Sequence, residues 1–355
     1  MNMYDVAIVG AGPAGANLAR LIGEKRSVVL IDKRDPGKPE EARPGGKCCG
    51  GLLAPDAQKM IAELGLGIPK DILVDPQLFA VRTIDLTNSL ERLYQRFYFN
   101  MDRGAFERWL ISTIPPSVEK RFDTVFLDYT EIPGGYKLRL IEGQKETTLE
   151  AAVIVGADGA CSKVRRALFG EKGAPEKYVA IQEWFACESP MPYFTAIFDE
   201  EVSDFYSWII PKDGAILFGA ALAPGPEASV RFELLKSKLT RLGFNFERKL
   251  RTEGAYIYRP TRASRFSPGK GGIALIGEAA GAISPSSAEG ISYALKTSLY
   301  LAQSLETGLN GFLPRYAKKA RRIRFNLLLK NMKSPAMYVP FLRKLAMKSG
   351  VNSIR

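Results

Sequence analysis

Histidine is absent from this sequence of 355 residues. Its absence excludes Ser-His-Asp and Cys-His catalysis, histidine-ligated zinc and histidine proton shuttles. Any proton donor must therefore be a carboxyl group, a tyrosine, a thiol, a lysine or water. Cysteine is scarce: Cys48, Cys49, Cys161 and Cys187 are too few and too irregular for a disulfide framework or a metal site, and they fit a reducing compartment.

Long apolar runs are missing as well. No stretch reaches the roughly 18 uninterrupted apolar residues of a membrane span, and the opening residues lead into a strand pattern rather than a signal peptide. We therefore expect a cytoplasmic protein. The composition, 46% hydrophobic and 25% charged, is that of a globular chain, and its length suits one large domain or two closely packed ones.

Acidic residues are missing from the last part of the chain. Residues 307–355 hold twelve Lys or Arg and no Asp or Glu, whereas the first 306 residues balance 38 basic against 38 acidic residues. The net charge of +12 therefore belongs to this C-terminal segment and not to the body of the protein.

The chain begins with the pattern of a dinucleotide-binding βαβ unit. Residues 4–9 predict a buried strand, a GxGxxG turn leads into a helix, and residues 27–31 predict a second strand that ends at Asp32. The glycines permit a tight turn, close approach of a pyrophosphate and close helix packing, while the acid accepts hydrogen bonds from ribose hydroxyls. A purely structural glycine turn is the alternative. The residues expected around the pyrophosphate are Gly10, Gly12, Pro13, Ala14 and Gly15.

Two later segments repeat the pattern of a strand that ends in a turn of small residues. Residues 154–159 precede a helix that opens at Ser162, and residues 276–281 precede a helix predicted over 288–305. Such turns let backbone and a helix N-terminus reach a second part of one cofactor. Each alone could be an ordinary structural turn, but three in this order favour FAD.

The three turns resemble the FAD signatures of flavoproteins of the geranylgeranyl reductase type, within the larger aromatic-hydroxylase-fold class. The similarity extends over nearly the whole chain, and residues 50–58, 178–182 and 276–295 also carry it. It implies FAD as the cofactor. One departure is Glu278, where most of the family has aspartate; glutamate offers a similar acceptor on a side chain one methylene longer.

The resemblance also implies which residues contact FAD. Besides the first glycine turn they are Asp32, Lys33, Cys49, Gly50, Arg103, Val125, Asp158, Gly277, Glu278, Gly281, Gly290 and Ile291. Arg103 follows Asp102, a suitable N-cap, at the start of a predicted helix, where a guanidinium can pair with a phosphate or ribose. The alternative for Arg103 is a surface arginine.

The family's Lys-x-Cys-Gly-Gly loop corresponds to residues 47–51, and it implies that the thiol of Cys49 lies near the flavin ring. A thiol there could donate or relay a proton, which a site without histidine needs; the alternative is a buried cysteine that acts as a small hydrophobe. Cys48 and Cys49 are adjacent rather than a CxxC pair, and no second GxGxxG follows. Both facts argue against a two-nucleotide disulfide reductase.

Residues 206–211 match the family's Tyr-x-Trp-x-x-Pro strand. Strand alternation places Tyr206 and Trp208 on one face, where they can wall an apolar pocket; ordinary sheet core is the alternative. The residues expected to line the substrate pocket are Tyr206, Trp208, Gln182, Trp184 and Phe198.

Taken with the resemblance, these features predict an FAD-dependent oxidoreductase that reduces carbon–carbon double bonds of an isoprenoid or other apolar lipid, with Cys49 as the catalytic proton donor. The expected electron donor is NAD(P)H or a ferredoxin-like protein. Two alternatives stay open. One is a flavin monooxygenase or halogenase of the same fold, although a halogenase would have tryptophan at position 206. The other is a flavin-bearing membrane adaptor without turnover.

The basic C-terminal segment has three interpretations. A helix packed on the body with a solvated basic face is the first. The second is peripheral contact with anionic lipid on the inner face of the membrane, where each Lys or Arg contributes about 1 kcal/mol. The third is binding of nucleic acid; no recognition motif accompanies the charge, so we expect no nucleic-acid partner. The crowded basic residues are Arg315, Lys318, Lys319, Arg321, Arg322 and Arg324.

The expected fold is α/β: a Rossmann-like FAD-binding domain with an inserted β-rich substrate domain, of the aromatic-hydroxylase type, and a helical C-terminus. An antiparallel sheet is predicted over 178–221, and breaks in the last helices are predicted at Pro335 and Pro340. The expected boundaries are 1–72, 100–172 and 258–306 for the FAD-binding domain, 73–99 and 173–257 for the substrate domain, and 307–355 for the basic segment.

Overall fold

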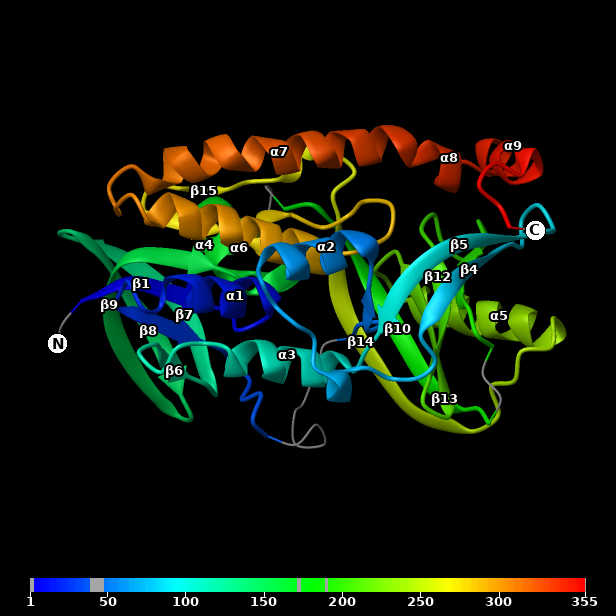
Figure 1. Ribbon diagram of the computed structural model, residues 1–355, viewed down its shortest axis with the longest axis horizontal. Helices are drawn as coiled ribbons and strands as arrows, with labels where there is room; N and C mark the ends of the chain where they lie inside the picture. Colours follow the sequence, from blue (N-terminus) through cyan, green and yellow to red (C-terminus); the bar gives the residue numbers. More distant parts are fainter. Residues whose placement is uncertain (1–2, 39–47, 171–173, 189–190, 355) are drawn as a thin grey trace.

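In the part of the chain that the structure describes, two sheets of eight strands each form the body of the protein, one toward each end of the molecule (Figure 1). The structure is a computed structural model that describes residues 3–38, 48–170, 174–188 and 191–354. The first sheet lies nearer the N-terminus, and the C-terminal helices run along one side of the molecule past both sheets.

The first sheet contains the predicted βαβ unit. Its strands run in the order β15-β16-β9-β1-β2-β6, and the antiparallel hairpin of β7 and β8 extends it from β9. β1 pairs in parallel with both β2 and β9, and its buried residues are Val, Ile and Ala, as expected for a strand covered on both faces. The bounds are β1 Tyr4–Val9, β2 Val28–Ile31, β6 Glu119–Arg121, β7 Thr124–Ile132, β8 Gly135–Glu142, β9 Lys145–Gly156, β15 Gly269–Lys270 and β16 Ile273–Leu275.

The helices around this sheet begin where the local sequence favours a start. The carboxylate of Asp102 accepts from the backbone N–H of Ala105, so the predicted N-cap is confirmed. The last of these helices begins at Ile291, three residues later than predicted, because Ala288 has a φ of +48° that an α-helix does not allow. The bounds are α1 Pro13–Ile22, α2 Pro55–Glu63, α3 Arg103–Ser112, α4 Lys163–Phe169 and α6 Ile291–Leu305.

The second sheet runs in the order β14-β10-β13-β12-β11-β4-β5-β3. Its strands between residues 178 and 221 pair antiparallel, as predicted. β11 pairs in parallel with β4, and this pairing joins the hairpin of β4 and β5 to the later strands. Helix α5 packs against one face, where Phe232 stacks on Phe218 of β13 with centroids 4.7 Å apart. The bounds are β3 Leu52–Leu53, β4 Leu78–Asp85, β5 Leu90–Asn100, β10 Glu176–Ala186, β11 Phe194–Phe198, β12 Ser207–Lys212, β13 Ala215–Leu222, β14 Lys249–Arg259 and α5 Ala228–Arg241.

The basic segment forms α7 (Phe312–Lys333), α8 (Pro335–Tyr338) and α9 (Pro340–Ser349). The two predicted breaks are confirmed, since each proline occupies the first turn of a new helix. Five residues of α7 form a buried stripe toward the body: Phe312, Tyr316, Ala320, Ile323 and Leu327. Within the described part of the chain, no helix combines the length and the apolar character needed to cross a membrane.

Candidate functional site

Three turns of small residues meet at one edge of the first sheet. β1, β9 and β16 are neighbouring parallel strands, so the turns that follow them emerge at the same edge. The turns also touch. A Cβ added at Gly10, whose φ is +108°, would lie 2.5 Å from the carbonyl oxygen of Ala157. One added at Gly277 would lie 2.9 Å from the Cβ of Ala14. The three predicted cofactor turns therefore form one surface.

The glycines of the first turn differ in what surrounds them. A Cβ at Gly15 would lie 1.8 Å from the carbonyl oxygen of Gly10, so close packing requires glycine there. A Cβ at Gly12 would meet no described heavy atom within 4 Å besides its own chain neighbours. Gly12 also precedes α1, whose first N–H groups and dipole favour an anion. This open position has the shape and polarity that a pyrophosphate needs.

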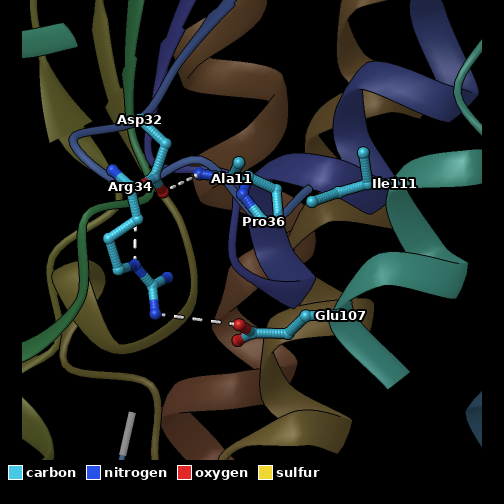
Figure 2. A pocket seen from close by; sticks show the side chains of 6 residues that line it. All are labelled: Ala11, Asp32, Arg34, Pro36, Glu107 and Ile111. Atoms are coloured by element: carbon cyan, nitrogen blue, oxygen red, sulfur yellow. Dashed lines mark hydrogen bonds and ion pairs between the residues drawn. The ribbon is translucent and has the colours of Figure 1, made fainter. Parts of the chain in front are cut away.

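Asp32 lies at one wall of a small cavity beside the first turn (Figure 2). Its carboxylate accepts from the backbone N–H of Ala11 at 2.7 Å and from that of Arg34 at 2.8 Å. The Arg34 guanidinium lies 3.5 Å from Asp32 and 3.8 Å from Glu107 of α3. Lys33, predicted as a contact, is exposed and does not line this cavity. The lining residues are Ala11, Asp32, Arg34, Pro36, Glu107 and Ile111.

Arg103 begins α3 with a side chain that is 10% exposed, and its guanidinium is only partly paired. Its Nη2 donates to Oε1 of Glu107 at 2.6 Å, while Nε and Nη1 are buried without a hydrogen-bond partner among the described residues. Burial lowers the pKa of Arg103, but the charges of Glu107, Cys49 and Glu278 outweigh this and raise it. An unpaired buried donor costs about 1–3 kcal/mol. The two N–H groups therefore fit an acceptor from a bound ligand, such as a phosphate or ribose oxygen.

Asp158 and Glu278 have side chains that also serve the fold. Asp158 accepts from the hydroxyl of Ser162 and, at 2.7 Å, from the N–H of Lys163, so it caps α4. Burial raises the pKa of Asp158. Oε1 of Glu278 accepts from the N–H of Tyr258 at 2.9 Å and ties β14 to the third turn. The structure thus gives both carboxylates a positioning role that the sequence does not reveal.

The remaining predicted contacts border the same edge. Val125 follows Thr124, whose N–H donates to the carbonyl of Asp32 at 3.0 Å. Gly281 ends the third turn with a φ of +79°, and Gly290 and Ile291 begin α6. These positions are consistent with backbone contacts to a cofactor.

The loop at residues 48–51 connects the two sheets. Cys48 is buried in the second sheet's core, where burial raises the pKa of its thiol, and its Sγ lies 3.8 Å from the carbonyl oxygen of Ala180. Cys49 is half-buried. A Cβ at Gly50 would lie 2.5 Å from Cδ1 of Ile210, so the loop lies directly against β12. Lys47, the first residue of the family motif, lies outside the described residues.

Lys212, which the sequence analysis does not single out, holds this loop in place. Its side chain is buried, and its Nζ donates to the carbonyl oxygens of Gly51 at 3.2 Å and Met101 at 2.9 Å. One ammonium therefore links Gly51, next to the predicted contact Gly50, to Met101, two residues before the predicted contact Arg103. Burial lowers the pKa of Lys212 to about 7, against the opposing influence of Cys49, Asp102 and Asp213.

The predicted substrate residues form one cluster on the second sheet. The rings of Tyr206 and Trp208 have centroids 5.6 Å apart, and Nε1 of Trp208 donates to Oε1 of Gln182 at 3.1 Å. Phe198 lies with its ring centroid 6.4 Å from that of Tyr206. Trp184 packs at the edge of the cluster, and its buried Nε1 has no partner in the described part of the chain.

A second cavity of about 130 Å³ lies beside this cluster. Three aromatic residues, Phe198, Phe205 and Tyr338, line it together with Asp199, Glu200, Ser203, Asp204 and Arg343. Phe205 also packs against Tyr206, with centroids 5.1 Å apart. The volume is close to the cavity of about 150 Å³ that holds benzene in another protein. It therefore has room for about one ring, and five of its eight lining residues are polar or charged.

Solved structures share this fold over nearly the whole chain. A geranylgeranyl bacteriochlorophyll reductase-like protein from Thermoplasma acidophilum aligns with a TM-score of 0.80 and 18% identity, over 97% of this chain and 91% of that one. A probable FAD-dependent monooxygenase from Pseudomonas aeruginosa, PqsL, aligns with a TM-score of 0.70 and 19% identity, over 98% and 99%. The predicted α/β fold class is therefore confirmed: the chain has the fold of FAD-dependent oxidoreductases.

Relatives at higher identity place the chain in a family. Protein CbrA of Escherichia coli is 42% identical over 354 residues, covering 100% of this chain and 95% of the relative. Protein CbrA of Shigella sonnei is 41% identical, covering 100% and 99%. The chain belongs to the CbrA family. No model of a known protein family matches it.

Three residues of the site escaped the sequence analysis: Arg34, Glu107 and Lys212. The first two had a weak local signal, since Arg34 is two residues after Asp32 and Glu107 is four after Arg103, the spacing of a helical ion pair. Lys212 had none, because its partners are 161 and 111 residues away in the sequence.

The buried lysine predicts a pH dependence of stability. The folded-state pKa of Lys212 is about 7 and its unfolded value is near 10.5, so between these pH values the unfolded state binds the extra proton. The free energy of unfolding of the wild type should therefore rise relative to that of Lys212→Met as the pH increases from about 7 to 10, by up to about 1.4 kcal/mol per pH unit.

Urea unfolding over this pH range measures the difference. The matched control is Lys137→Met, because Lys137 is exposed on β8 and its curve should run parallel to that of the wild type. A Lys212→Met curve that also ran parallel to the wild type would contradict the depressed pKa.

Proposed function

We propose that this chain is an FAD-dependent oxidoreductase that reduces carbon–carbon double bonds of an isoprenoid or another apolar lipid. The observation that carries the cofactor assignment is the buried guanidinium of Arg103, whose Nε and Nη1 lack partners within the described chain. The open position at Gly12 supports it. Two structural neighbours support it as well, since one is a probable FAD-dependent monooxygenase and the other is geranylgeranyl bacteriochlorophyll reductase-like.

The residues of the site would hold the cofactor at two places. Gly12 and the first N–H groups of α1 would face the pyrophosphate, and Asp32 would accept from a ribose hydroxyl in the cavity of Figure 2. Arg103 would donate to a phosphate or ribose oxygen through the two N–H groups that are otherwise unpaired.

The reaction adds two hydrogen atoms across one double bond. When bound and reduced by NAD(P)H or a ferredoxin-like donor, FAD would supply one of them as hydride. The second arrives as a proton at the other carbon, and in a chain without histidine we assign this proton to the thiol of Cys49. Lys212 interacts electrostatically with Cys49, and its pKa of about 7 allows it to restore that proton at neutral pH.

The aromatic cluster would orient the substrate. Tyr206 and Trp208 present apolar surface, while Gln182 fixes the Trp208 ring by accepting from its indole N–H. The unpaired Nε1 of Trp184 offers a donor to a polar end of the substrate. Because the neighbouring cavity holds about 130 Å³, a long chain would leave most of its length outside it or require the pocket to widen.

The reaction class is tested by mass spectrometry of a lipid extract incubated with the chemically reduced protein, with and without oxygen. A species that gains hydrogen atoms in pairs in the absence of oxygen is the expected result, and it identifies the substrate. A product that gains an oxygen atom only in air, or a halogen atom when halide is present, would show instead a monooxygenase or halogenase of the same fold.

The glycine turn gives a matched pair of variants for the cofactor. Gly12→Ala should fold like the wild type but lose most of its bound FAD, because the added methyl occupies only the open position. Gly15→Ala should fail to fold stably, since its methyl would meet the carbonyl oxygen of Gly10. Absorbance of released flavin per protein and thermal unfolding measure both effects. Full flavin content in Gly12→Ala would contradict the pyrophosphate placement.

The two adjacent cysteines give a second pair. Cys49→Ala should retain FAD and lower the turnover of double-bond reduction by about a hundredfold or more, the size of a lost general acid. Cys48→Ala should leave turnover near the wild-type value, because the Cys48 thiol is buried in the second sheet's core. Turnover is measured anaerobically with chemically reduced protein. An unchanged rate in Cys49→Ala with FAD still bound would rule out the proton-donor role.

A further inference from the structure

The outer side of the C-terminal helices is apolar as well as basic. Phe325 and Met332 on α7 are 61% and 70% exposed, and Phe341 on α9 is 67% exposed. We define the outer apolar face by these and three further exposed residues: Phe325, Leu328, Leu329, Met332, Phe341 and Leu345. Figure 1 shows α7 and α9 along one side of the molecule.

The spacing of these residues makes the face continuous. Phe325, Leu328, Leu329 and Met332 follow the i, i+3, i+4, i+7 pattern of one side of a helix. Met332 is nine residues after the buried Ile323, and at 3.6 residues per turn the two point in about opposite directions. α7 therefore has two apolar sides: one packs on the body, and the other has no partner within the described chain.

Positive charge surrounds the outer apolar face. Lys318, Arg321, Arg322 and Arg324 are exposed on the preceding turns of α7, and Lys348 is exposed on α9. Residues 307–355 contain no acidic side chain at all. Asp56 of α2 forms an ion pair with α7, and its Oδ2 lies 3.5 Å from Nζ of Lys330. Any partner of this face must therefore accept both apolar contact and a dense positive charge.

We propose that the outer apolar face docks the protein on an anionic lipid surface. Large apolar side chains can enter the boundary between headgroups and acyl chains, while the long Lys and Arg side chains reach the phosphates. A second copy of this chain fits poorly, because it would bring two acid-free basic segments together. The helices contribute area and charge without spanning the bilayer.

The proposal goes beyond the reaction and does not depend on it. It does give the second cavity a location relative to the membrane. Tyr338 of α8 lines that cavity, while its neighbours Met337 and Val339 are exposed. Docking through α7 and α9 would therefore place one wall of the cavity next to the lipid phase.

Flotation of the purified full chain with vesicles tests the proposal. At low salt the protein should float with phosphatidylcholine vesicles that contain about one-third phosphatidylglycerol, and should remain behind with pure phosphatidylcholine. High salt should weaken the association. Protein that fails to float with the anionic vesicles, or floats equally with both, overturns the proposal.

Two pairs of variants separate the apolar and charged contributions. Phe325→Ser with Met332→Ser, and separately Arg321→Gln with Arg322→Gln, should each lower vesicle affinity at least about tenfold, as expected for two lost groups of this kind. The controls are Val230→Ser on α5, where Val230 is 69% exposed, and Lys137→Gln with Lys145→Gln on the first sheet. Control affinities should stay within about twofold of the wild type.

Sedimentation of the same proteins without vesicles tests whether a second copy of the chain, rather than lipid, covers the outer apolar face. A monomer at micromolar concentration agrees with lipid docking. A dimer that Phe325→Ser with Met332→Ser dissociates would assign the face to self-association and overturn the proposal. Flavin absorbance recorded on every sample shows whether FAD is bound, so a failure of docking is not confused with a failure of the proposed function.

Discussion

The contact between the turns after β1, β9 and β16 is the constraint on which the rest of the structure depends. The backbone at Gly10 approaches that at Ala157, and Gly277 approaches Ala14, so closely that side chains are excluded. This contact brings segments from residues 10, 157 and 277 to one sheet edge. It leaves Gly12 as the open position beside the N-terminus of α1, and an anion-binding surface follows from that arrangement.

Buried cations connect this edge to the second sheet. Among the described residues, Arg103 donates to Glu107 and keeps two donors for a ligand, whereas Lys212 donates to backbone carbonyls and so holds the loop that carries Cys49. The absence of a side chain at Gly51 makes room for this ammonium, because a Cβ there would lie 2.7 Å from Nζ of Lys212. The proposed proton donor therefore sits on a loop whose position is fixed by charge and by the absence of side chains.

The sequence predicts those parts of the fold that local hydrophobic periodicity, capping residues and helix-breaking residues specify. The βαβ start, the cap at Asp102 and the break at Pro335 all depend on neighbouring residues, and all are confirmed. Lys212 could not be predicted as buried, since the backbone carbonyls that accept from it belong to segments distant in the sequence. The outer apolar side of α7 could not be predicted either, because apolar residues among basic ones also fit a helix packed on the body. Only the structure shows that Ile323 faces inward and Met332 outward.

Binding of nucleotides to the flavin-stripped protein tests the central claim most directly. Because Gly12, α1 and Asp32 would engage the adenosine diphosphate half of the ligand, FAD should bind one per chain and at least about a hundredfold more tightly than FMN, a difference of about 2.7 kcal/mol. NAD should bind no better than FMN, since it offers no isoalloxazine ring to the loop of Cys49. Equal affinity for FAD and FMN, or preference for NAD, would contradict the assignment of this edge as an FAD site.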